Sequence, residues 1–181
     1  AATPRARHCG ATCGRYSWMR PARQVRDDAN PMTEVRFYHL IDQRLDRVLP
    51  QLLEVSLSRG WRVVVQASSE ERVEAIDAHL WTYRDDSFLP HGTTRNADVA
   101  AQPILIMAGE GNPNGANVRF LIDNAPLPED AGNYERLVLI FDGNDDDAVA
   151  QARERWTETK TKGFEASYWQ PDESGRWVQK A

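Results

Sequence analysis

Two uninterrupted apolar runs constrain the fold of this chain more than any other feature. They are Val63-Val64-Val65 and residues 137–141, whose sequence is Leu-Val-Leu-Ile-Phe. A strand with one face in water alternates polar and apolar residues, whereas a continuous apolar run is typical of a strand buried on both faces. Strands of this kind belong to largely parallel sheets that helices cover on both sides. The runs therefore predict an α/β domain.

Stretches of helical periodicity alternate with the strands, as such a domain requires. We expect helices over residues 46–59, from Ser68 as N-cap to Leu80, and over residues 145–162. Pro50 lies close to the start of the first helix or kinks it. We expect further strands over residues 35–40, 104–107 and 118–122, and a closing hairpin of residues 166–170 and 176–180. The order predicts a single domain with a mixed, mostly parallel sheet and helices on both faces.

The N-terminal segment differs from the rest in composition. Residues 1–31 are rich in Ala, Arg and Pro and show no periodicity, so we expect a disordered leader or a non-native extension before Met32, and a folded domain over residues 32–181. Cys9 and Cys13 lie in this segment beside His8, but without flanking structure they make a poor metal site. We expect neither a metal nor a cofactor.

The charge of the chain is unevenly distributed. Its net charge is −5, and residues 1–31 carry six arginines against two aspartates, which leaves −9 on residues 32–181. Phosphate contacts need a basic face, so we do not expect strong direct binding of nucleic acid. No apolar run approaches the length of a membrane span, and residues 32–181 contain no cysteine, which suits the cytoplasm.

Two polar loops could in principle hold a ligand. Residues 109–115 (Gly-Glu-Gly-Asn-Pro-Asn-Gly) lack a following helix and a Gly-Lys-Ser/Thr sequence, so we interpret them as a hairpin loop that needs positive φ angles. The acidic run from Asp142 to Asp147 follows a buried strand, where α/β proteins often bind ligands, although helix capping also explains it. A small nucleotide-binding enzyme that uses this edge stays open as an alternative function.

The sequence contains no convincing catalytic group. His39, His79 and His91 are far apart, and none accompanies a nucleophile motif. We expect His91 in a turn and all three histidines to be hydrogen-bonded or solvated, and we expect no catalytic residue.

Two clusters fit protein binding better. Arg153, Trp156, Thr157 and Lys160 recur at helical spacing, so they form either a solvated face with Trp156 in the core or a groove for an acidic peptide with an apolar end. In residues 80–92, Trp81 lies about 100° beyond Leu80 on the helix. Trp81 and Phe88 therefore form an outward apolar patch or fold together under a loop.

Several short motifs occur in the order found in a known family. They are Phe37-Tyr38, residues 60–65 (Gly-Trp-Arg-Val-Val-Val), Leu80-Trp81 with residues 87–91 (Ser-Phe-Leu-Pro-His), residues 152–156 (Ala-Arg-Glu-Arg-Trp) and Gly163-Phe164. With these motifs the chain resembles the chi subunit of bacterial DNA polymerase III from Met32 to about Gln170.

The resemblance implies a Rossmann-like domain without a dinucleotide fingerprint, a cofactor or catalysis. It implies an accessory subunit that links the clamp loader to single-stranded DNA-binding protein by binding the acidic, Phe-terminated tail of that protein. By position, the tail site falls on Arg153, Trp156, Thr157 and Lys160, with Thr157 in place of the Lys of better-studied members. The surface for the psi subunit, or another clamp-loader subunit, falls on Trp81 and Phe88.

Overall fold

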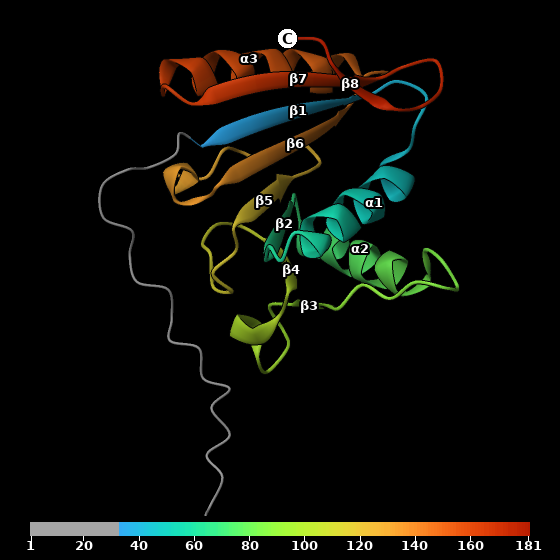
Figure 1. Cartoon of the computed structure of the whole chain (residues 1–181). Helices are drawn as coiled ribbons and strands as arrows, with labels where there is room; N and C mark the ends of the chain where they lie inside the picture. Colours follow the sequence, from blue (N-terminus) through green and yellow to red (C-terminus); the bar gives the residue numbers. More distant parts are fainter. Residues whose placement is uncertain (1–32) are drawn as a thin grey trace, which may run out of the picture. The chain divides into compact units, whose positions relative to one another are not determined.

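A computed structural model describes residues 33–181 and confirms the α/β architecture (Figure 1). The prediction for residues 1–31 lies outside the described residues. In chain order the helices and strands are β1 (Glu34–Leu40), α1 (Leu45–Ser58), β2 (Val63–Ala67), α2 (Glu70–Thr82), β3 (His91–Thr93), β4 (Ile104–Ala108), β5 (Val118–Leu121), β6 (Arg136–Asp142), α3 (Asp146–Thr161), β7 (Glu165–Pro171) and β8 (Trp177–Gln179).

Within residues 33–181 the strands form one sheet in the order β3-β4-β2-β5-β6-β1-β7-β8. Every neighbouring pair is parallel except β7 and β8, so both the mostly parallel sheet and the closing hairpin are confirmed. Val63 and Val65 belong to one hydrophobic core and Val64 to the other. The two cores lie on opposite faces of the sheet, which explains why no polar residue interrupts this run.

Helices cover both faces of the sheet, as predicted. The core that contains Val63 also contains the buried residues of α1 and α2, such as Leu53 and Ile76, and these two helices lie together over the β2 half of the sheet (Figure 1). The core that contains Val64 includes Ala148 and Ala152 of α3, which packs on β6 and β7. The sheet therefore separates the α1 and α2 side from the α3 side.

Pro50 lies inside α1, and a side chain from α2 compensates for its missing N–H. In a regular helix the N–H of residue 50 would donate to the carbonyl oxygen of Asp46, four residues earlier. That oxygen lies 2.7 Å from Nε2 of His79, so the Nε2–H of His79 donates the bond that Pro50 cannot make. His79 is thus a hydrogen-bonded structural residue, as expected.

Two local predictions, a helix boundary and a turn, are wrong. Ser69, not Ser68, is the N-cap of α2: its side chain accepts a hydrogen bond from the backbone N–H of Arg72 at 3.3 Å. Either serine could cap the helix by its chemistry, and the extended backbone of Ser69 (φ −153°, ψ 165°) makes it the residue that does so. His91, expected in a turn, begins the short strand β3, which the sequence pattern did not reveal.

The glycine-rich loop of residues 109–115 is not a hairpin. It connects β4 to β5, which both pair in parallel with β2 on its two sides, so the loop crosses over β2. Three glycines in it have positive φ angles, as predicted. The buried guanidinium of Arg119 holds the loop by donating to the carbonyl oxygens of Gly109 and Gly111 at 2.7 and 2.6 Å.

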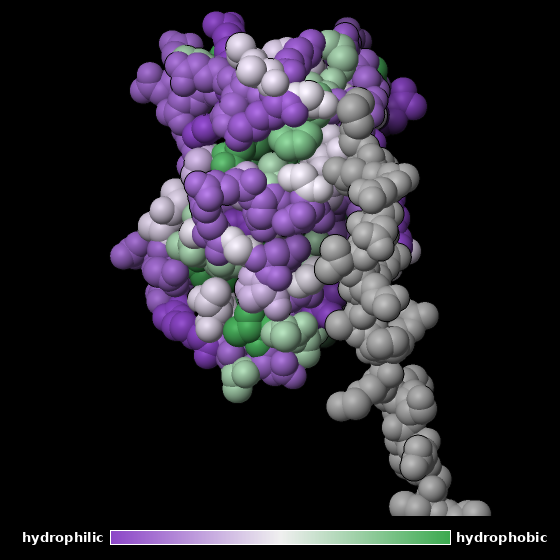
Figure 2. Space-filling model, turned by 90° about the vertical axis from the view of Figure 1, so that its left-hand side faces the viewer, coloured by the Kyte–Doolittle hydropathy of each residue, from purple (hydrophilic) through white to green (hydrophobic). Residues whose placement is uncertain are grey.

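The surface at the end of the sheet where β1 and β6 begin is mostly hydrophilic, with small apolar areas between polar side chains (Figure 2). Among residues 33–181, no helix has the length and apolar content to cross a membrane.

Candidate functional site

Helix α3 presents the predicted peptide-binding stripe. Asp145 fixes its start, because its carboxylate accepts hydrogen bonds from the N–H groups of Asp147 and Ala148 at 3.0 and 3.2 Å. Gly163, with φ +79°, follows its C-terminal end. The buried residues Ala148 and Ala152 direct one side of α3 into the core, which places the next side along a depression in the surface.

That depression is a pocket of about 450 Å³ between α3 and the sheet. Its walls are mainly aromatic and aliphatic, with a cationic side chain and a few hydroxyl or imidazole groups. The lining residues are Phe37, His39, Phe141, Val149, Ala152, Arg153, Trp156, Thr157, Tyr168 and Ala181. The structure therefore brings Arg153, Trp156 and Thr157 to one pocket. A volume of this size accommodates a bulky apolar side chain.

Trp156 joins the pocket to its charged rim. Its half-buried ring meets Phe37 edge to face at a centroid distance of 5.1 Å. The ammonium of Lys160 lies 4.7 Å from the centre of the same ring, a cation–π contact, although Lys160 does not line the pocket itself. Arg153 and Lys160 are both exposed. An apolar pocket flanked by two accessible cations has the chemistry that an apolar residue with nearby carboxylates requires.

A hydrogen-bonded cluster closes the other end of the pocket. Nδ1 of His39 lies 2.5 Å from the hydroxyl of Tyr168 and 2.9 Å from Nε2 of Gln170. The amide nitrogen of Gln170 can only donate, so Nδ1 of His39 accepts and the proton of the neutral ring is on Nε2. The imidazole stacks on Phe141 with a centroid distance of 4.9 Å. The cluster holds this wall of the pocket in one arrangement.

Burial and nearby charges shift the pKa values of His39 and Tyr168 at this end of the pocket. Burial lowers the pKa of His39, and the carboxylate of Asp142 partly opposes that shift. Burial raises the pKa of the Tyr168 hydroxyl, while its bond to Gln170 and the positive charge of Arg153 act in the opposite direction. The pocket therefore contains a neutral imidazole and a neutral phenol at neutral pH, and its positive charge is at the rim.

Other groups on α3 are committed to contacts within the helix. Arg155 donates to Glu158 at 3.2 Å, and Lys162 lies 2.8 Å from the same carboxylate. Because Arg155 is paired in this way, it is a poor substitute for the positive charge that a lysine at position 157 would supply. The hydroxyl of Thr157 donates to the backbone oxygen of Arg153 at 3.1 Å. Arg153 and Lys160 are thus the cations that face the pocket region.

Sequence reasoning missed the part of the pocket that comes from the sheet. Phe37, His39 and Tyr168 are on β1 and β7, and the parallel register places Phe37 opposite Tyr168. The only sequence signal was the alternation in these strands, which puts residues 37 and 39 on the face that α3 covers. His39, expected to be hydrogen-bonded or solvated, is hydrogen-bonded in the pocket wall.

The second predicted surface lies at the end of α2. Trp81 and Phe88 are 58% and 67% exposed, and their ring centroids are 5.8 Å apart. Both rings therefore face outward, which excludes the alternative that they fold under a loop. The apolar patch that they form belongs to the side of the sheet opposite α3.

Polar contacts fix the chain beneath this patch. One carboxylate oxygen of Glu54 accepts hydrogen bonds from the hydroxyls of Tyr83 and Ser87, each at 2.7 Å, and these two hydroxyls also contact each other. The buried ring of His91 lies 4.8 Å from the indole of Trp81. Its Nδ1 lies 2.6 Å from the backbone oxygen of Leu89, so that Nδ1–H donates to this oxygen. The rings of the patch thus rest on an ordered support.

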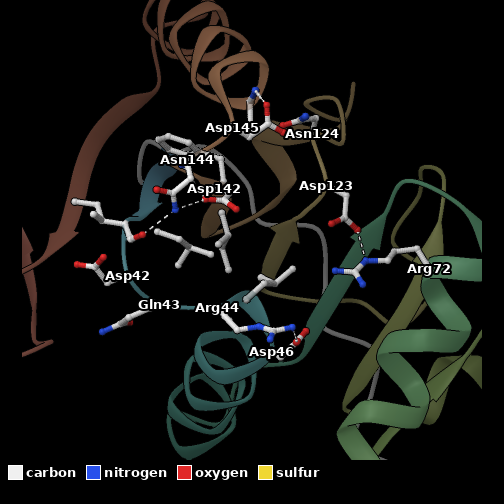
Figure 3. A pocket seen from close by; sticks show the side chains of 16 residues that line it. Asp42, Gln43, Arg44, Asp46, Arg72, Asp123, Asn124, Asp142, Asn144 and Asp145 are labelled. Atoms are coloured by element: carbon white, nitrogen blue, oxygen red, sulfur yellow. Dashed lines mark hydrogen bonds and ion pairs between the residues drawn. The ribbon is translucent and has the colours of Figure 1, made fainter.

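The acidic edge forms a different crevice, of about 480 Å³, at the carboxyl ends of β1 and β6 (Figure 3). Arg72 points at Asp123 and pairs with it at 2.7 Å. Asp142 accepts from the backbone and side-chain nitrogens of Asn144 at 2.9 and 3.0 Å, and Asp145 caps α3. These polar groups bind one another, as the capping interpretation predicts, and no group of three or more His, Cys, Asp or Glu side chains in residues 33–181 could hold a metal ion.

Comparisons with known proteins agree with the resemblance. Residues 32–167 match the family described as DNA polymerase III chi subunit, HolC. A probable DNA polymerase III subunit chi of Rickettsia prowazekii is 25% identical over 124 residues, which are 65% of this chain and 75% of that protein. The subunit chi of Pseudomonas aeruginosa is 28% identical over 140 residues, covering 74% of this chain and 93% of the relative. The subunit chi of Haemophilus influenzae is 28% identical over 108 residues, covering 60% and 74%. The chain therefore belongs to the chi subunit family of DNA polymerase III.

Proposed function

We propose that this chi subunit binds the acidic, phenylalanine-terminated tail of single-stranded DNA-binding protein on α3 and thereby links that protein to the clamp loader. The observation that carries the proposal is the pocket beside Trp156, with the exposed cations Arg153 and Lys160 near it. The terminal phenyl group enters the pocket, and the acidic residues and the terminal carboxylate pair with the cations.

Membership of the chi family makes the chain an accessory subunit of a DNA polymerase, with a role in DNA replication and no catalytic activity of its own. The alternative of a small nucleotide-binding enzyme at the edge from Asp142 to Asp147 finds no support, because Arg72 is already paired and both Asp142 and Asp145 are engaged in turn and capping bonds.

The direct test is a titration of a fluorescently labelled peptide with the last residues of the host's single-stranded DNA-binding protein. A pocket for one side chain with two cations supports an affinity in the micromolar range, which corresponds to about −8 kcal/mol. Affinity should fall as salt rises, because the cations are exposed and their attraction is screened.

Two substitutions separate the charged and apolar parts of the site. The double variant Arg153→Glu/Lys160→Glu should weaken binding about tenfold or more, and Trp156→Ala should remove the apolar contact. Lys162→Glu is the matched control, since it reverses a charge on the same helix away from the pocket and breaks only its pair with Glu158. Equal binding by wild type and the double variant would refute the site.

The patch of Trp81 and Phe88 is our candidate surface for the psi subunit or another clamp-loader subunit. Two exposed aromatic rings on an ordered support are typical of residues that dominate a protein interface. In a pull-down from the native lysate, Trp81→Ala/Phe88→Ala should lose the clamp-loader subunit and retain single-stranded DNA-binding protein. The Arg153→Glu/Lys160→Glu variant should give the reverse result, and loss of both partners in either variant would contradict separate surfaces.

A further inference from the structure

A cluster of arginines and tryptophans occupies a part of the molecule that neither candidate surface uses. It lies where β1 and β6 begin, on the α1 side of the sheet, because Arg36 alternates with Phe37, which packs on the α3 side. We call it the arginine–tryptophan face, and its members are Glu34, Arg36, Arg59, Trp61, Arg136 and Trp169.

Cations and rings stack on one another across this face. The guanidinium groups of Arg59 and Arg136 lie 5.1 and 4.9 Å from the ring centre of Trp61. The guanidinium of Arg36 lies 5.0 Å from the ring of Trp169. All three arginines therefore meet an aromatic ring, and both indoles are only partly buried. Flat guanidinium and indole groups are the surfaces on which nucleic acid bases stack.

This face carries three arginines but only one carboxylate that pairs with them, that of Glu34. Glu34 alone binds two of the arginines, with one oxygen 2.6 Å from Nε of Arg36 and the other 2.6 Å from Nη2 of Arg136. Burial lowers the pKa of Arg136, and repulsion from Arg36 and Arg59 contributes to this shift. Glu34 has the opposite effect on Arg36, whose pKa it raises against the effect of burial, so the arginine that remains least compensated by a carboxylate is Arg59. The three cations converge here although the domain around them carries a net charge of −9. Three guanidinium groups beside one carboxylate leave an excess of positive charge that attracts an anionic ligand.

We propose that the arginine–tryptophan face binds single-stranded DNA. Aromatic rings combined with arginines bind single strands without sequence preference, because every base can stack and every phosphate can pair. Trp61 and Trp169 are partly accessible for such contacts. Arg59 is the most accessible cation and is the first contact for a phosphate, while Arg36 and Arg136 keep 21% and 16% of their side chains exposed. An acidic peptide would satisfy the cations but would not use the rings. The face does not overlap the pocket beside α3.

The test is fluorescence anisotropy of a labelled oligothymidine of about 15 nucleotides, which matches the upper range of single-strand site sizes. Binding is expected to be weak at physiological salt, because the domain is acidic. For two to three phosphate contacts, the slope of log affinity against log salt should be roughly −1.4 to −2.1, since each contact contributes about −0.7. A slope near zero would overturn the proposal.

Point variants locate the site on the full chain. Arg59→Glu should weaken binding by about fivefold or more, while Glu34→Gln should strengthen it by releasing two guanidinium groups. Arg95→Glu is the matched control: it reverses the charge of an exposed arginine that follows β3, at the opposite edge of the sheet, and should have a smaller effect. Residues 1–31 carry six arginines but are identical in every variant, so the comparison between variants is the test.

Two results would overturn the assignment. One is an Arg59→Glu protein that binds the oligonucleotide as well as wild type does, because this exposed substitution leaves the fold intact. The other is displacement of the oligonucleotide by polyglutamate at the same charge concentration, which would make the face a general site for acidic peptides. Displacement by unlabelled oligothymidine but not by polyglutamate supports the proposal.

Discussion

Replacing Gly143 by alanine should damage the wall of the peptide pocket from a position outside it. A Cβ atom at this position would overlap the imidazole of His39 at Nε2 and Cδ2 and would lie only 2.7 Å from the backbone oxygen of Leu40. The backbone N–H of Gly143 already donates to that oxygen at 2.6 Å, so the chain cannot easily move away. The imidazole has to swing out of its place.

The cost follows from the contacts that His39 would lose. It would give up hydrogen bonds to Tyr168 and Gln170 and its stacking on Phe141. Two hydrogen bonds contribute about 0.5–1.5 kcal/mol each, and overpacking costs about 1–3 kcal/mol. We therefore expect Gly143→Ala to lower the free energy of unfolding by about 2–6 kcal/mol, with a weaker affinity for the tail peptide.

Urea unfolding followed by circular dichroism measures this change. Gly132→Ala is the matched control, because a Cβ atom there has no neighbour within 4 Å and the φ angle of Gly132 is not positive. If Gly143→Ala and Gly132→Ala unfolded at the same urea concentration, the argument that His39 is pressed against Gly143 would be wrong.

Two further predictions concern the histidines. His79→Ala should lower the free energy of unfolding by about 1–2 kcal/mol, because the partly buried carbonyl of Asp46 loses its donor. In urea unfolding the loss should shrink in a Pro50→Ala background, where residue 50 supplies its own N–H. Burial holds the pKa of His39 below its ordinary 6.5, so its contribution to stability is present above that pH and is lost as the pH falls towards the folded-state pKa. Wild type should therefore lose more stability between pH 7.5 and 5.5 than His39→Gln does, and equal losses would contradict a neutral His39 in the folded protein.

The parts of the fold that follow from local sequence were predictable. The run Val63-Val64-Val65 indicated a strand buried on both faces because each face needs its own apolar residues. The strand β3 was not predictable, since its three residues (His91–Thr93) owe their conformation to pairing with β4 rather than to a pattern of their own. The loop of residues 109–115 was misread for the same reason: glycine content predicts positive φ angles but not which strands the loop joins.

The candidate site also has one part that the sequence predicts and one part that it does not. Arg153, Trp156 and Thr157 share one stripe of a helix, so their spacing alone places them together. His39 and Tyr168 are 129 residues apart in sequence, and only the pairing of β1 with β7 brings them to the same wall. Sequence reasoning could identify the helical half of the pocket, while the half that comes from the sheet required the register.

The structure explains why the residues of the motif Leu80-Trp81 with Ser-Phe-Leu-Pro-His occur together. Ser87 is bound to Glu54 of α1, and His91 lies under Trp81, so the polar members of the motif support its exposed rings. These rings lie on the α2 side of the sheet, whereas the pocket beside Trp156 lies on the α3 side. A partner on one surface therefore leaves the other accessible, which is the geometry that an adaptor between two proteins requires.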